Sequence, residues 1–175
     1  MEDDIIGIDP GSRRTGWGVI RERSGVLELV DCGVIRARTD AEYDFSQRLA
    51  VIYRELLEII SRLNPGEAAV EQVFTAQNAR SALKLGQARG AAIAACAAGD
   101  LKIYDYEPTL IKKSVVGAGR AEKDQVAFMV KRLLNARDGE YALDTTDALA
   151  AAICHAATRR FERFAGKAPA GRRAL

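Results

Sequence analysis

The sequence has no long apolar run, a single histidine and only three cysteines. Its apolar stretches are all shorter than a bilayer-spanning helix requires, so we expect no membrane partner. The acidic start, Met1–Asp4, is unlike a secretory signal or a mitochondrial transit peptide. Cys32, Cys96 and Cys154 lie far apart in apolar segments, which is typical of reduced core thiols and argues against a disulfide framework or a zinc site. These features predict a cytoplasmic protein.

Length and charge distribution predict one domain followed by a basic tail. A chain of 175 residues can form a sizeable core but is too short for two large lobes. The net charge is +2, yet six of the seven charged residues in 158–175 are basic, so the rest of the chain is slightly acidic. We expect a single domain over 1–164 and a basic, mobile tail over 165–175. Such a tail suits a polyanionic partner, although many tails of this kind only aid solubility.

The order of the expected elements predicts an α/β fold. Three strands, over 5–9, 15–20 and 26–36, should form an antiparallel meander with a turn at Ser24-Gly25. Helices over 45–63 and 78–98 then alternate with strands over 68–70 and 101–106, and two last helices contain 126–134 and 144–164. This order predicts a mixed five-stranded sheet with helices on both faces.

Two segments carry more specific expectations. The helix over 78–98 begins polar and becomes apolar on all sides, so its second half should be deeply buried. The stretch over 109–123 is basic and contains Gly117-Ala118-Gly119, so we expect it to be flexible.

Four acidic residues lie where the elements of such a fold would converge. Asp9 ends the first strand, just before a Pro-Gly pair that stops regular structure. Glu71 ends the fourth strand, and the carboxyl ends of strands in this layout gather at one edge of the sheet. Asp144 and Asp147 are three residues apart at the start of the last helix, on neighbouring positions of one face.

Some of these acids also have a simpler interpretation. Asp9 could begin a solvated turn, and Asp144 could cap the last helix with Asp147 beside its positive end. Four converging carboxylates, however, repel one another unless positive charge compensates them. Mg²⁺ prefers oxygen ligands, and a pair of such ions can activate water and stabilise the leaving oxygen of a phosphodiester. Taken together, the four acids favour a metal site over capping.

Five motifs resemble the RuvC family of Holliday-junction resolvases, in order and at the family spacing from about Ile5 to His155. They are Gly7–Ser12 with Thr15-Gly16, Val70–Phe74, Ser81–Gly90, Val115–Gly117 with Ala121–Lys123, and Asp144–Leu149. Two positions depart from the usual pattern. Trp17 stands where Tyr is expected, and Asp144 stands where some relatives have His.

The resemblance implies a ribonuclease-H-like fold and a bacterial homodimer that cuts two symmetric strands of a four-way DNA junction during recombination and repair. By motif, it implies that the catalytic, metal-binding acids are Asp9, Glu71, Asp144 and Asp147. It implies two Mg²⁺ per active site, with Mn²⁺ as a substitute. It also implies the branch-migration proteins RuvA and RuvB as partners.

Five further residues are candidate DNA contacts: Phe74, Arg80, Lys112, Lys113 and Lys123. Phe74 could stack on an unpaired base or merely anchor its loop, and family position favours the base. Lys112 and Lys123 match family basic residues near the active site, whereas Lys113 and Arg80 could contact phosphates or simply be solvated.

The 78–98 helix is also a candidate dimer interface, because Gly86 and Gly90 form a small-residue groove beside Leu83. Alternatively, both glycines could let the helix lie close on its own sheet. His155 lies about 16 Å along the last helix from Asp144, too far to share a metal, so we expect a structural role.

Three other functions are compatible with part of the sequence. Gly7–Ser12 resembles the first phosphate loop of actin-like kinases and ATPases, but those proteins need two lobes and a second phosphate loop. A ribonuclease acting on RNA–DNA hybrids would share the carboxylates. A non-catalytic junction-binding module would not need all four acids.

Overall fold

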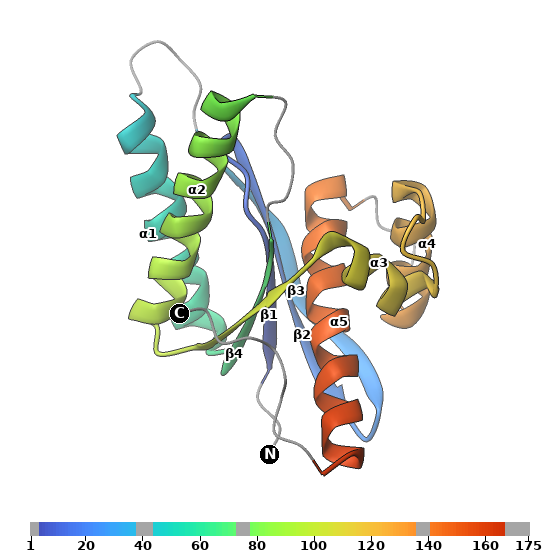
Figure 1. The fold of residues 1–175 in the computed structure, drawn as a ribbon. Helices are drawn as coiled ribbons and strands as arrows, with labels where there is room; N and C mark the ends of the chain where they lie inside the picture. Colours follow the sequence, from blue (N-terminus) through green and yellow to red (C-terminus); the bar gives the residue numbers. More distant parts are fainter. Residues whose placement is uncertain (1–3, 38–43, 73–77, 136–140, 167–175) are drawn as a thin grey trace.

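The computed structural model describes residues 4–37, 44–72, 78–135 and 141–166. Its five strands form one sheet in the order β3-β2-β1-β4-β5 (Figure 1). The strands are β1 (Ile5–Asp9), β2 (Arg14–Arg23), β3 (Val26–Arg36), β4 (Glu67–Glu71) and β5 (Lys102–Tyr106). β1 pairs antiparallel with β2 and parallel with β4, so the sheet is mixed, as predicted.

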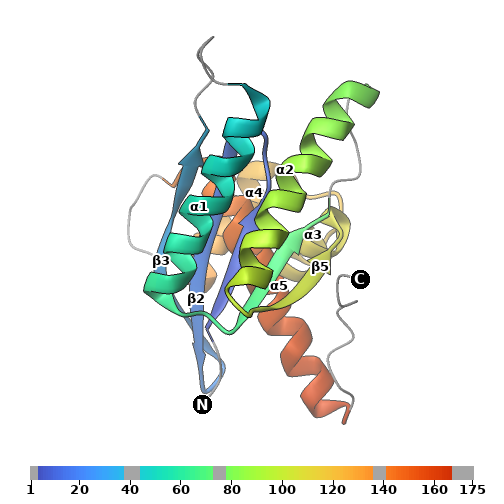
Figure 2. The same ribbon diagram turned by 90° about the vertical axis from the view of Figure 1, so that its left-hand side faces the viewer.

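Helices cover both faces of this sheet (Figures 1 and 2). They are α1 (Phe45–Leu63), α2 (Ala79–Ala98), α3 (Pro108–Val116), α4 (Lys123–Leu133) and α5 (Leu143–Phe164). α1 and α2 pack side by side on one face, and α5 lies on the other with α3 and α4 outside it. The α/β fold with helices on both faces is therefore confirmed.

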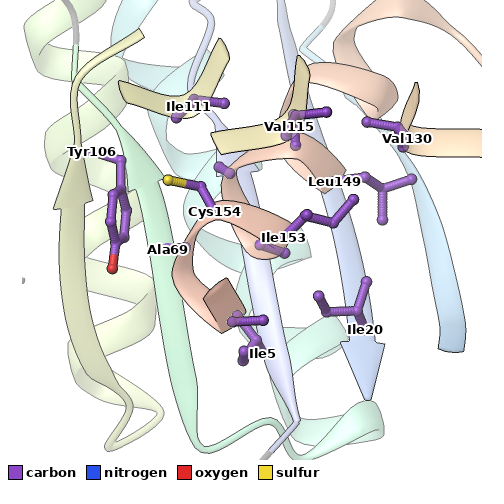
Figure 3. Close-up of a cluster of buried hydrophobic side chains, with 14 of the residues drawn as sticks. Ile5, Ile20, Ala69, Tyr106, Ile111, Val115, Val130, Leu149, Ile153 and Cys154 are labelled. Carbon is purple, nitrogen blue, oxygen red and sulfur yellow. The ribbon is translucent and has the colours of Figure 1, made fainter. Parts of the chain in front are cut away.

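The alternating side chains of β1 contribute to two separate cores. Ile5 points into the cluster under α3, α4 and α5, which Figure 3 shows with Leu149 and Ile153. Ile6 and Ile8 point into the cluster under α1 and α2. Because successive side chains of a strand face opposite sides, Asp9 shares the α5 side of the sheet with Ile5.

Two glycines let α5 lie directly against the sheet. A Cβ on Gly7 would overlap the backbone of Ala148, and a Cβ on Gly16 would overlap the carbonyl of Asp144. The first turns of α5 therefore pass unusually close to β1 and β2. This close approach brings the start of the helix to the carboxyl end of β1.

Two expectations about helices were wrong. Residues 108–116, which cover the first half of the stretch expected to be flexible, form α3, with Pro108 in its first turn and Gly117 at its end in the left-handed conformation (φ 84°). In the second half of α2 only one face is buried, and Ala94 and Ala97 are exposed. The buried residues are Ala88, Ala92, Ala95 and Cys96. An Ala-rich helix packs closely on one side without being surrounded.

The remaining expectations concern the cysteines, the tail and membranes. Cys32, Cys96 and Cys154 are free thiols; Cys96 and Cys154 are buried in the core, as predicted, whereas Cys32 is only partly buried. α5 ends at Phe164, and most of the expected tail (167–175) lies outside the described residues. Within the described ranges, every helix is too short or too polar to cross a membrane.

Candidate active site

Asp9 and Glu71 lie side by side at the carboxyl ends of β1 and β4. The parallel register pairs Ile8 with Val70, so the two acids that follow are neighbours. They line a cleft of about 320 Å³ together with Asp147. The sequence-based expectation that the strand ends bring these carboxylates together is borne out by this geometry.

Burial and mutual repulsion raise the pKa values of both carboxyl groups. Burial, followed by the charges of Asp147 and Asp144, raises the pKa of Asp9 to about 6. Burial, followed by the charges of Asp9 and Asp147, raises the pKa of Glu71 to about 8. A hydrogen bond joins the two side chains. At neutral pH most molecules therefore keep one proton on this pair of carboxyl groups, and a bound cation would displace it.

Asp144 lies in the first turn of α5 but does not cap the helix. The N-cap residue is Ala142, and no side chain caps this end. The Asp144 carboxylate instead forms an ion pair with Arg14 at the start of β2, with 2.6 Å between Nε and Oδ2. The capping interpretation is therefore wrong, and Arg14 is a contact that the sequence analysis did not identify.

Asp147, the other acid of α5, is paired with Lys123 at the start of α4. The Lys123 Nζ donates a hydrogen bond of 2.9 Å to Asp147 Oδ2. This hydrogen bond is the main reason that the pKa of Lys123 is raised. Lys123 also lines the cleft, as expected for a residue that works near the acids.

The other candidate DNA contacts differ in their relation to the cleft. Lys112 on α3 lines it, whereas Lys113 is exposed. Arg80 is exposed near the start of α2. Phe74 lies outside the described residues. Gln72 also lines the cleft directly after β4; it belongs to the Val70–Phe74 motif but was not among the candidate site residues.

His155 is buried far from the acids along α5, as predicted. Its Nε2 donates to Glu67 Oε2 at 3.1 Å, and its Nδ1 lies 2.6 Å from the hydroxyl of Tyr106. Arg159 Nη1 donates to the same Glu67 oxygen at 2.8 Å. His155 therefore belongs to a buried polar network that links α5 to β4 and β5.

The donor set suits a hard divalent cation, because all four acids supply carboxylate oxygens. Across the described ranges, however, no three His, Cys, Asp or Glu side chains are yet arranged to hold a metal ion. Two of the four acids are engaged by cations of the protein, Asp144 by Arg14 and Asp147 by Lys123. The four acids fit a metal by chemistry, and three of them, Asp9, Glu71 and Asp147, line the same cleft.

Comparisons with known proteins find relatives over most of the chain. A protein of Oleidesulfovibrio alaskensis named Crossover junction endodeoxyribonuclease RuvC is 63% identical over 92% of this chain and 95% of its own length. The protein of the same name from Solidesulfovibrio magneticus is 59% identical over 93% of this chain and 94% of its own length. The structure described as T. thermophilus RuvC in complex with Holliday junction substrate superposes with a TM-score of 0.84 at 30% identity, covering 91% of this chain and 96% of that one.

A more distant structure shares the fold. The yeast mitochondrial Holliday junction resolvase Ydc2 superposes with a TM-score of 0.66 at 14% identity, covering 93% of this chain and 82% of that one. The model of the family described as Crossover junction endodeoxyribonuclease RuvC matches residues 5–155, which include all four acids. The chain therefore belongs to the RuvC family of crossover junction endodeoxyribonucleases.

Proposed function

We propose that this chain resolves four-way DNA junctions with a two-metal site made of Asp9, Glu71, Asp144 and Asp147. Family membership makes it an endodeoxyribonuclease of recombination and repair. The observation that carries the metal site is the buried pair of carboxylates, whose pKa values are raised to about 6 and about 8 beside two more acids. Such a cluster needs positive charge, and Mg²⁺, with Mn²⁺ as a substitute, supplies it through oxygen ligands.

The residues of the cleft have separate roles in this reaction. When bound, the metal pair would activate water and stabilise the leaving oxygen. Asp9 and Glu71, on rigid strand ends, hold the metal-binding oxygens in fixed positions. Lys123 lines the same cleft and presents its ammonium group to a phosphate once Asp147 releases it. Lys112 lines the same cleft, from α3, and can stabilise negative charge on the same phosphate.

The remaining candidate residues would contact DNA outside the reacting phosphate. Lys113 and Arg80 are exposed and can bind the backbone of the junction arms. Phe74, in the segment between β4 and α2, would stack on a base unpaired at the crossover. These roles extend the family resemblance to particular side chains.

A homodimer would supply the second active site that two symmetric cuts require. Leu83, Gly86 and Gly90 recur at the three-four spacing of one helical face of α2. Leu83 is 69% exposed, and a Cβ on either glycine would meet no described atom within 4 Å. The alternative that these glycines pack on the sheet is therefore wrong. An open face with small residues fits close approach by the same helix of a second copy.

The cellular setting follows from the family. We infer a bacterial cytoplasmic protein that receives junctions from the branch-migration proteins RuvA and RuvB. The two related proteins described above come from bacteria, and their similarity extends over nearly the whole chain.

A cleavage assay tests the proposed function. A synthetic four-way junction and an RNA–DNA hybrid are incubated with the protein in Mg²⁺, Mn²⁺ or EDTA, and the cut positions are mapped on each strand. Paired cuts at symmetric positions, dependent on the metal, are expected. Cleavage of the hybrid alone would favour a ribonuclease, and binding without cleavage would favour a junction-binding module.

A further inference from the structure

Asp144 is oriented differently from the other three acids. Its carboxylate forms the 2.6 Å ion pair with Arg14, and both side chains are partly exposed, at 30% and 47%. The described residues that line the cleft include Asp9, Glu71 and Asp147 but not Asp144. Asp144 nevertheless lies close enough for its charge to raise the pKa of Asp9. It therefore borders the cleft while its Oδ2 is engaged by Arg14 on β2.

The backbone fixes the place where this ion pair forms. The carbonyl of Asp144 packs against Gly16, two residues after Arg14 on β2. The next residue, Thr145, donates its hydroxyl hydrogen to the carbonyl of Gly33 on β3 at 3.2 Å. The first turn of α5 is thus held on the β2–β3 edge. Arg14 can reach Asp144 without any movement of the main chain.

A guanidinium cannot share this carboxylate freely with a metal ion. It keeps its charge at physiological pH, so it cannot make room by losing a proton. A divalent cation at Asp144 would repel it, and the Asp144 oxygen that Arg14 engages is not free to bind metal. Since Arg14 is about half exposed, its side chain can instead turn away into solvent.

We propose that Arg14 is an intramolecular competitor that holds Asp144 until metal displaces it. This inference rests on the proposed function, because it takes Asp144 as a metal ligand. In the metal-free protein Arg14 compensates the charge of Asp144. Metal binding then includes the opening of this ion pair. The free energy needed to break the pair lowers the apparent metal affinity. Arg14 is a positioning residue and does not contact the reacting atoms.

The size of the effect follows from the exposure of the ion pair. Partly exposed ion pairs contribute little because solvent screens them, and removing one should tighten metal binding about two- to five-fold. If Arg14 instead held Asp144 in its metal-binding orientation, its loss would weaken binding. The two roles therefore predict changes of opposite sign.

Binding of Mn²⁺ tests the proposal without relying on cleavage. Free Mn²⁺ is measured by electron paramagnetic resonance during titration of the full chain, alone and bound to a four-way junction carrying uncleavable phosphate analogues at its centre. The variants are Arg14→Gln and Arg13→Gln, with circular dichroism to verify folding. Arg13→Gln removes the same charge from the adjacent position but leaves the Arg14–Asp144 pair in place. Tighter binding by Arg14→Gln than by Arg13→Gln is expected, by about two- to five-fold.

The other outcomes separate this inference from the proposed function. Equal Mn²⁺ affinities for the two Arg variants would mean that Arg14 acts only through its general charge, and would overturn the proposal. Weaker Mn²⁺ binding by Arg14→Gln than by Arg13→Gln would overturn it as well. Asp147→Asn serves as the check on the metal site itself and should weaken Mn²⁺ binding strongly. If wild type binds no Mn²⁺ under either condition, or Asp147→Asn binds it unchanged, the metal site and the role of Arg14 both fail.

Discussion

Asp9 and Glu71 share a hydrogen bond at the ends of two parallel strands, and burial raises the pKa of both. Raised pKa values mean that the folded, metal-free protein binds protons more tightly than the unfolded chain does. The stability that these protons provide is complete below the ordinary carboxyl pKa and is lost as pH rises through about 6 for Asp9 and about 8 for Glu71.

This relationship predicts a pH-dependent response to metal. The melting temperature of the metal-free protein should contain a component that falls between about pH 5 and pH 8, and Glu71→Gln should reduce it. Mg²⁺ should bind more tightly as pH rises through the same range, with release of protons. Calorimetric titration in buffers of different ionisation enthalpy measures that release. Metal binding without any proton release would contradict the shared proton.

Replacement of the acids should separate cleavage from binding. Asp9→Asn, Glu71→Gln and Asp147→Asn should each lower the cleavage rate beyond the roughly 10- to 100-fold typical of residues that only support metal ligands. Junction affinity should be retained, because each change removes negative charge facing DNA. Gel-shift assays in Ca²⁺ and single-turnover cleavage in Mg²⁺ measure the two effects. Retained cleavage in any of the three would remove that residue from the metal site.

Asp144→Asn tests the fourth proposed metal ligand. Asp144 is not a helix cap, so the variant should melt close to wild type while cleavage falls. Thermal denaturation and the cleavage assay together decide this point. A variant with normal cleavage would leave Asp144 as no more than the partner of Arg14.

Sequence patterns predicted the sheet and the meeting of Asp9 and Glu71 at its edge because both depend on local signals. Short apolar segments and the Ser24-Gly25 turn marked the strands, and a carboxylate at a strand end is visible in the sequence itself. α3 had local signals too, namely Pro108 in the first turn and Gly117 after the last, but the nearby glycines and lysines suggested a flexible stretch instead. The prediction of a flexible stretch was wrong because it gave the basic, glycine-containing composition more weight than the signals for the two helix ends.

The cation partners of Asp144 and Asp147 could not be predicted in the same way. Arg14 and Asp144 meet only because Gly16 lets α5 lie against β2. Lys123 meets Asp147 because α4 folds back beside α5. Both contacts depend on tertiary placement, for which neither residue carries a sequence signal. Family resemblance marked Lys123 but not Arg14.

Two adjacent lysines on α3 offer a matched pair for testing the cleft. Lys112 lines it and Lys113 is exposed, so only Lys112→Ala should slow cleavage substantially, by about 100-fold if it stabilises charge in the transition state. Lys113→Ala should mainly lower the slope of log affinity against log salt by about one unit. Salt-dependent binding and single-turnover rates distinguish these effects. Equal rates for both variants would reduce Lys112 to a surface charge.

The buried network around Glu67 should be important for stability. Burial alone would raise the pKa of Glu67, but the hydrogen bond and charge of His155, with the charge of Arg159, hold this pKa below its usual value. Glu67→Ala leaves Arg159 buried without one of its carboxylate partners and should destabilise the protein by about 3–5 kcal/mol. Urea denaturation of the metal-free protein measures this loss.

A surface ion pair provides the control for that prediction. Arg62 and Asp31 are 2.9 Å apart but 56% and 39% exposed, so Arg62→Ala should cost at most about 1 kcal/mol. Similar losses of stability for Glu67→Ala and Arg62→Ala would mean that the buried network contributes no more than the surface pair.

The contribution of this network to stability should also depend on pH. Because the pKa of Glu67 is lowered, the stability from its network should persist above the ordinary glutamate pKa and disappear as pH falls through the lowered value.

The exposed face of α2 gives a direct test of the dimer. Gly86→Leu with Gly90→Leu places both new side chains in open space, so the double variant should fold. If this face is the interface, the variant should be a monomer that nicks one strand at a time. Circular dichroism and sedimentation velocity measure fold and assembly, and cleavage of a plasmid cruciform distinguishes nicked from linear product.

A glycine on the sheet provides the opposite control. Gly16→Ala should disrupt folding, because its new methyl group would overlap the carbonyl of Asp144. The two sets of variants thus separate a glycine required for packing within the chain from glycines left open for a second copy. A folded double variant that remains fully dimeric, and still makes paired cuts, would place the interface on a different surface of the protein.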